Sequence, residues 1–115
     1  MNAKIELRPI FFEQSKAVVL EASYGELDRL AELLLQNPGL HIRIEGHTDN
    51  VGKVEDLQKL SEDRAIAIRD FLVKKGCAGT RIETKGFGAK APLSNNDSEE
   101  SRAKNRRVEI IITKV

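Results

Sequence analysis

The sequence predicts an α/β two-layer sandwich (an α+β fold), with helices packed on one mixed four-stranded sheet. Apolar residues recur with strand or helix spacing in the order β-α-β-α-β-β along the chain. Strands that are joined through a helix pair in parallel, with a right-handed crossover. The 115 residues, 40% of them hydrophobic, fit a single domain over residues 1–115 with one modest core.

The first half of the chain is expected to form a strand, a helix and a second strand. Residues 5–12 carry β-type side chains interrupted by a proline, which suits an edge strand. Ser23 and Glu26 form a capping-box pattern, and apolar residues follow at helical spacing until an Asn-Pro-Gly sequence at residues 37–39 ends the helix. Residues 40–45 then alternate between apolar and polar side chains, as a half-buried strand does.

The second half begins with a loop at residues 46–52, which leaves the C-terminal end of the second strand. The elements expected after it are a helix, a strand, a short helical turn and a last strand, at residues 55–75, 82–87, 98–104 and 107–113. A glycine ends the helix, and the segment before the last strand is polar and rich in turn residues.

Charge and cysteine content argue against several classes of partner. The 19 Lys and Arg against 18 Asp and Glu give a formal net charge of +1, which does not favour a broad electrostatic footprint for nucleic acid or anionic lipid. A basic cluster (Arg102, Lys104, Arg106 and Arg107) has acidic neighbours and no interleaved aromatic residues, so we expect no nucleic-acid partner. A single cysteine, Cys77, excludes an internal disulfide and a cysteine-based zinc site.

The spacing of reactive residues is not typical of an enzyme or of a metal centre. Neither Ser61 nor Cys77 has a base partner that the spacing reveals. His41 and His47 lack a third ligand at metal-binding spacing, and no carboxylate pair recurs. We therefore expect a non-catalytic protein with no metal and no cofactor.

Arg64 interrupts the apolar pattern of the second helix. At about 100° per residue, Leu57, Leu60, Ile68 and Phe71 form one narrow stripe, and Arg64 falls in the middle of it. A guanidinium group keeps its charge, so burying it is costly unless an anion lies close. The pattern therefore predicts an anionic partner for Arg64, supplied by the protein or by a ligand.

Asp49 is the candidate anion within the protein. It lies in the loop at residues 46–52, and ligands of α/β sheets commonly bind outside the carboxyl ends of strands. One interpretation is a plain salt bridge between Asp49 and Arg64, with Asp49 also accepting backbone hydrogen bonds in the turn. The other is a zwitterionic ligand, whose carboxylate binds Arg64 and whose ammonium binds Asp49. The spacing leaves both interpretations open.

Three motifs surround these residues: GHTDNVG at residues 46–52, LSEDRA at residues 60–65 and NRRVEI at residues 105–110. The residues of these motifs, their order and their separation resemble those of the OmpA-like C-terminal domain, the peptidoglycan-binding family of OmpA, Pal and MotB. The resemblance extends from about Pro9 to Val115. It implies the same two-layer fold.

Domains of that family bind peptidoglycan non-covalently through the diaminopimelate of the stem peptide. Carried over to this sequence, the resemblance implies that Asp49 holds the ammonium of this zwitterion and Arg64 its carboxylate. Arg106, the first arginine of NRRVEI, would add a second cationic contact. The implied function is non-catalytic attachment of an envelope protein to the cell wall.

The resemblance also implies supporting residues. Thr48 and Asn50 would shape the loop, Ser15 would lie on the opposite wall of the pocket, and Arg102 matches an arginine that precedes the third motif. Leu57 stands where the family usually has asparagine, and family members often carry Asp or Asn at the position of Ser15. These departures leave open an alternative: a structural or protein–protein interaction module whose pocket is degenerate.

The resemblance places such a domain on the periplasmic side of the cell envelope. We expect it to be excised from a longer envelope protein that is associated with the outer membrane. Contact with the membrane would come only through parts of that protein outside this chain.

Overall fold

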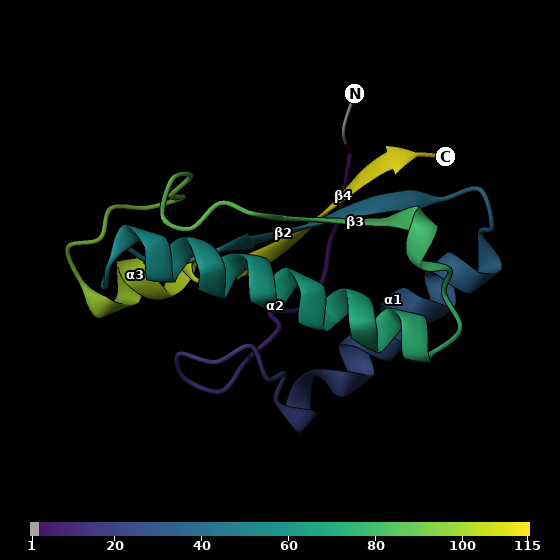
Figure 1. Ribbon diagram of the computed structural model, residues 1–115, viewed down its shortest axis with the longest axis horizontal. Coiled ribbons are helices and arrows are strands. Elements are labelled where there is room, and N and C mark those ends of the chain that lie inside the picture. The colour runs from purple at the N-terminus through teal and green to yellow at the C-terminus, as the bar shows by residue number, and fades with distance from the viewer. Residues whose placement is uncertain (1–2) are drawn as a thin grey trace.

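A computed structural model, which describes residues 3–115, contains the two layers that the sequence predicts (Figure 1). The strands are β1 Lys4–Ile5, β2 His41–His47, β3 Ile82–Gly86 and β4 Arg107–Lys114. The helices are α1 Tyr24–Gln36, α2 Val54–Lys74 and α3 Glu99–Asn105, with 3₁₀ turns η1 at Glu21–Ser23 and η2 at Gly79–Arg81. Between residues 3 and 115, no helix has the length and apolar character needed to cross a bilayer.

The four strands form one mixed sheet in the order β1-β4-β2-β3. β2 and β3 are parallel and joined through α2, whereas β4 is antiparallel to both β2 and β1. α1 and α2 run along the same side of this sheet, and α3 lies at the end where β2 finishes and β4 begins (Figure 1). The predicted mixed four-stranded sheet with helices on it is therefore confirmed.

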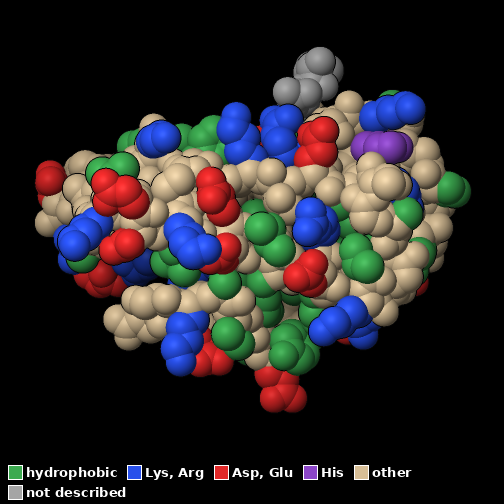
Figure 2. Space-filling view, viewed as in Figure 1, with side chains coloured by type: hydrophobic (Ala, Val, Ile, Leu, Met, Phe, Trp, Pro, Cys, Tyr) green, Lys and Arg blue, Asp and Glu red, His purple; other side chains and the backbone are tan. Residues whose placement is uncertain are grey.

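The core lies between the sheet and the two long helices. Its largest fully buried side chains alternate along the strands and follow the helical spacing read from the sequence, and they are Leu27, Leu30, Leu34, Ile42, Ile44, Ile68, Leu72 and Ile110. Each such side chain stabilises the fold by about 1.5–3 kcal/mol relative to an exposed position. The charged side chains remain outside this core, and both signs are interspersed over the face that Figure 2 shows.

The start of α1 differs from the predicted capping box. Ser23 has helical backbone angles because the 3₁₀ turn η1 precedes α1, and its side chain makes no cap hydrogen bond. Ser23 Oγ instead accepts a hydrogen bond of 2.9 Å from the backbone N–H of Phe11. Glu26 accepts one of 2.6 Å from the backbone N–H of Arg8 and forms a 2.8 Å ion pair with Arg29. The two residues hold the N-terminal segment on α1 and do not cap the helix.

Other element boundaries also differ from the sequence-based expectation. Of the expected strand at residues 5–12, only Ile5 pairs with β4, together with Lys4 before it, and Phe12 forms an isolated bridge with Val19. β2 continues to His47, two residues into the expected loop, because β4 pairs with it as far as Arg107.

α2 crosses the ends of β2 and β3 in close contact, and two glycines allow this. A Cβ at Gly46 would overlap the backbone carbonyl oxygen of Ser61. A Cβ at Gly86 would lie 2.5 Å from Ser61 Oγ and 2.6 Å from the backbone nitrogen of Glu62. Ser61 Oγ is fully buried and accepts a 2.9 Å hydrogen bond from the N–H of Gly88. This contact fixes the position of α2 over the strand ends.

Replacing Gly46 tests the close contact. Gly46→Ala should lower the free energy of unfolding by about 2 kcal/mol or more, because the obstacle is backbone and cannot rotate away. Gly25→Ala, within α1, is the matched control: nothing lies within 4 Å of a Cβ there, so the variant should be more stable by up to about 1 kcal/mol. Urea unfolding measures both. Equal stability of Gly46→Ala and the wild type would contradict the close contact.

Glu26 predicts a pH dependence of stability. Hydrogen bonds from Arg29 and from the backbone N–H of Arg8 lower the pKa of Glu26 from 4.5 to about 2. A carboxylate with a depressed pKa stabilises the fold above its unfolded pKa, and this contribution disappears as the pH falls toward the folded value. The stability difference between the wild type and Glu26→Gln should therefore shrink between about pH 5 and about pH 2. Urea midpoints across that range measure it, and a constant difference would contradict the assignment.

Candidate functional site

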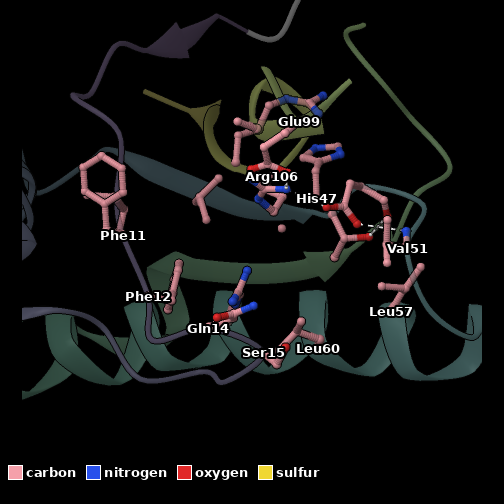
Figure 3. A pocket seen from close by; sticks show the side chains of 18 residues that line it. Phe11, Phe12, Gln14, Ser15, His47, Val51, Leu57, Leu60, Glu99 and Arg106 are labelled. Carbon is pink, nitrogen blue, oxygen red and sulfur yellow. Dashed lines mark hydrogen bonds and ion pairs between the residues drawn. The ribbon is translucent and has the colours of Figure 1, made fainter. Parts of the chain in front are cut away.

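A cavity of about 600 Å³ opens at the carboxyl end of β2. Its walls come from four segments: residues 10–15, the end of β2 with the loop to Val51, α2, and the junction between α3 and β4. Gln14 and Ser15 lie beside α2, across the cavity from Glu99 and Arg106 (Figure 3). Segments far apart in the sequence therefore meet at one site.

Five of the seven predicted site residues line this cavity: Ser15, Thr48, Asp49, Arg64 and Arg106. Asn50 and Arg102 are not among the lining residues. Asn50 is exposed at the outer side of the loop. Arg102 turns back onto its own loop, where its NH1 donates a 3.1 Å hydrogen bond to the backbone oxygen of Asn96.

Asp49 is buried, and its two carboxylate oxygens have different partners. Oδ1 accepts a 2.9 Å hydrogen bond from the backbone N–H of Val51, which closes the turn after β2. Oδ2 forms a 2.7 Å ion pair with NH1 of Arg106. Thr48 supports the same turn, because its hydroxyl donates a 2.7 Å hydrogen bond to the Asp49 carbonyl and its N–H donates to Gly88. The carboxylate is thus fixed at the cavity wall.

Arg64 has a different set of partners from the one expected. Its guanidinium Nε donates to the backbone oxygen of Lys16 at 3.0 Å, and NH2 donates to that of Glu13 at 3.3 Å. The guanidinium carbon lies 4.8 Å from the centroid of the Phe12 ring. Among residues 3–115, no carboxylate forms an ion pair with Arg64. The interpretation of Asp49 and Arg64 as a plain salt bridge is therefore wrong, because Asp49 forms its ion pair with Arg106 instead.

The electrostatic environment of Arg64 follows from this arrangement. Burial, and then the positive charge of Arg106, lower the pKa of the Arg64 guanidinium, while Asp49 opposes the change. Arg106 is in the opposite situation: hydrogen bonds to Glu99 and then to Asp49 raise its pKa. Of these two arginines, Arg106 is therefore paired with carboxylates, and Arg64 is half-buried without a counter-charge. The latter favours an anion.

Glu99 is a lining residue that sequence reasoning did not assign to the site. Its carboxylate pairs with NH2 of Arg106 at 2.5 Å, and the hydrogen bond lowers the pKa of Glu99. The sequence alone indicates Glu99 only as an acidic neighbour of the basic cluster at residues 102–107. Helical spacing could not indicate this pair, because Arg106 follows the end of α3 with an extended backbone. Leu60 also lines the cavity, although its place in the apolar stripe of the helix indicates a core residue.

Asn105 holds the loop that precedes α3. It is fully buried, and its Oδ1 accepts hydrogen bonds of 2.8 and 3.0 Å from the backbone N–H groups of Leu93 and Ser94. Its Nδ2 donates to the backbone oxygen of Ser94 and to Oδ1 of Asn96. The adjacent residue is Arg106, so this network sets where the cavity wall lies.

A second cluster lies on the strands themselves. Glu45, His47 and Glu109 each place a potential ligand atom within 4.8 Å of the others. The fold thus brings two carboxylates close to His47, although the sequence shows no third ligand at metal-binding spacing. Linear spacing could not show this cluster, because it depends on the β2–β4 register, which pairs Glu45 with Glu109.

Fold and cavity together define a two-layer α+β domain with a charged cleft at the strand ends. The chain belongs to the OmpA family, which matches it over residues 11–106. The family resemblance is thereby confirmed.

Three similar proteins illustrate the relationship. Outer membrane porin F of Pseudomonas aeruginosa is 44% identical over 99 residues, which cover 85% of this chain and 28% of the porin. Peptidoglycan-binding protein ArfA of Mycobacterium tuberculosis is 41% identical over 104 residues, which cover 90% of this chain and 32% of ArfA. The chain thus spans about a third of the length of these relatives.

The third is a solved structure, the peptidoglycan-associated lipoprotein from Burkholderia pseudomallei. It superposes with a TM-score of 0.84 at 28% sequence identity, and the alignment covers 94% of this chain and 91% of that chain. The α+β fold is therefore shared across the whole domain.

Two asparagines near the cavity should differ sharply in their effect on stability. Asn105→Ala removes four hydrogen bonds from a fully buried position, so the free energy of unfolding should fall by about 2–4 kcal/mol. Asn50→Ala, at an exposed position, should change it by no more than about 0.5 kcal/mol. Thermal unfolding and limited proteolysis at residues 93–97 measure both effects. Equal stabilities would contradict the anchoring role of Asn105.

Proposed function

We propose that this domain binds peptidoglycan without catalysis, through the diaminopimelate of the stem peptide, and so attaches an envelope protein to the cell wall. The observation that carries the proposal is the state of Arg64. Its guanidinium is half-buried at the cavity wall, is bound to two backbone oxygens and has no carboxylate partner among the described residues. A bound carboxylate would supply the missing charge.

A zwitterionic amino-acid end matches the remaining charges of the cavity. Its carboxylate would bind Arg64, with Arg106 as a second cation nearby. Its ammonium would bind Asp49, whose Oδ2 is shared with Arg106 in the free domain. Arg107, the fifth charged lining residue apart from His47, is paired with Glu109, and the other four (Asp49, Glu99, Arg64 and Arg106) carry no net charge together, which suits a ligand that is itself neutral overall.

The similar proteins support peptidoglycan as the partner. One is called peptidoglycan-binding and another peptidoglycan-associated, and both align over at least 90% of this chain. Their names, with that of the porin, also support a setting on the periplasmic side of the envelope, associated with the outer membrane. In that setting, any contact with the membrane would come from parts of the protein beyond this domain.

Binding to the cell wall is tested by co-sedimentation with purified sacculi that contain diaminopimelate. Asp49→Asn and Arg64→Gln should each weaken binding by about tenfold or more, because each leaves a ligand charge without its partner in a partly buried site. Arg69→Gln is the matched control: it removes the same charge from the same helix, outside the cavity lining. Its binding should equal that of the wild type.

Titration with free diaminopimelate, followed by NMR, separates the ligand from the wall as a whole. Shifts confined to resonances around Asp49 and Arg64 are expected. Unchanged sedimentation of both cavity variants would contradict the site. Failure of the wild type to bind sacculi would favour the alternative, a structural or protein-interaction module of the same fold.

A further inference from the structure

The cluster on β2 and β4 lies on the face of the sheet that points away from α2. Gly46 faces Ser61 of α2, so its neighbours in the strand, Glu45 and His47, point to the opposite face. Glu109, the cross-strand partner of Glu45, points the same way. His47 Nε2 lies 4.0 Å from Glu45 Oε1 and 3.9 Å from Glu109 Oε2.

His47 is the unusual member of this cluster. Its side chain is 3% exposed, and neither ring nitrogen has a hydrogen-bond partner. Its ring stacks on Phe87, with centroids 4.9 Å apart and planes at 10°, so its orientation is fixed. A buried imidazole is costly without partners. Here its Nε2 is aimed between two carboxylates, at a distance too long for hydrogen bonds.

We propose that Glu45, His47 and Glu109 form a binding site for a first-row divalent cation of the zinc class. One imidazole nitrogen and two carboxylate oxygens are a ligand set that zinc accepts, with water in the fourth position. Ligands around zinc lie about 3.3–3.6 Å apart, so the cluster would close by about 1 Å on binding. His47 also belongs to the lining of the cavity, but the proposal does not rest on peptidoglycan binding.

Three cations surround the carboxylates and determine how the metal enters. Arg43 binds Oε2 of Glu45 at 2.7 Å and leaves Oε1 free, facing His47. Arg107 and Lys4 bind Oε2 and Oε1 of Glu109 at 2.6 and 2.7 Å. Lys4 is the most exposed of the three, at 52% of its side chain, and belongs to a two-residue edge strand. The Glu109 oxygen nearest His47 is Oε2, so a metal would replace Arg107 at this oxygen, while Lys4 adds a positive charge at Oε1.

Such a metal would tie the end of β2 to β4. Only Thr48 separates His47 from Asp49, and His47 pairs in register with Arg107, which follows Arg106. A bound cation would therefore hold together the two strand ends that carry cavity residues. We therefore assign the site a structural role, in which the metal fixes the two strands relative to each other.

Isothermal titration calorimetry of the untagged domain with ZnCl₂ at neutral pH is the test. One-to-one binding, reversed by EDTA, is expected, together with NMR shifts of the His47 ring and a higher thermal midpoint. MgCl₂ at the same concentration should have no effect, because Mg²⁺ requires six oxygen ligands. Absence of one-to-one zinc binding by the wild type would overturn the proposal.

Variants assign the ligands. His47→Gln, Glu45→Gln and Glu109→Gln should each weaken zinc binding by about tenfold or more. His41→Gln, the same substitution in the same strand, should bind as the wild type does. Lys4→Gln should bind zinc more tightly, because it removes a positive charge beside Glu109. Zinc affinity that is unchanged in His47→Gln, or that falls in Lys4→Gln, would contradict the geometry; if His47→Gln does not fold, the two glutamate variants decide.

Discussion

The close contact of α2 with the strand ends determines most of what this domain does. Gly46 and Gly86 lack side chains where the backbone and side chain of Ser61 approach. This contact sets the height of α2 over the sheet, and therefore the position of Leu57, Leu60 and Arg64 along the cavity wall. Side chains at these two positions would occupy the space between α2 and the sheet. They would hold the helix farther away, and Arg64 would then lie farther from the loop that carries Asp49. The cavity is thus a consequence of how the helix packs.

Of the two arginines that lie across the cavity from each other, only one has carboxylate partners, and this difference explains why the cavity favours a ligand. Arg106 satisfies itself with Asp49 and Glu99, both on its own side of the cavity. Arg64 lies on the facing helix and has only backbone oxygens and the Phe12 ring. A carbonyl dipole stabilises a guanidinium less than a carboxylate does. The same four charges in two symmetrical pairs would close the site, whereas this arrangement leaves one cation in need of an anion.

The sequence predicts elements well and partners poorly. Periodicity located the two long helices and the three long strands, because burial of one face imposes it. It also singled out Arg64, since a charge within an apolar stripe is visible without a structure. The prediction that Ser23 caps the helix was wrong, because a 3₁₀ turn gives that residue a helical backbone and residue spacing does not indicate such a turn. The interpretation of Asp49 and Arg64 as a salt bridge was wrong for a related reason. Two arginines lie near the one carboxylate, and only the three-dimensional distances show that Arg106 is its partner.

The end of β2 shows how one strand can serve two faces. Because side chains alternate along a strand, Gly46 lies under α2. Glu45 and His47, on either side of it, therefore point to the open face of the sheet, away from the helices. The strand then ends, alternation no longer applies, and Thr48 and Asp49 turn into the cavity through hydrogen bonds to Gly88, Val51 and Arg106. Pairing of His47 with Arg107 fixes where β2 ends. The register between β2 and β4 therefore sets the geometry of the cavity and of the open-face cluster together, because a slip of one residue would send the side chains of β4 to the opposite face.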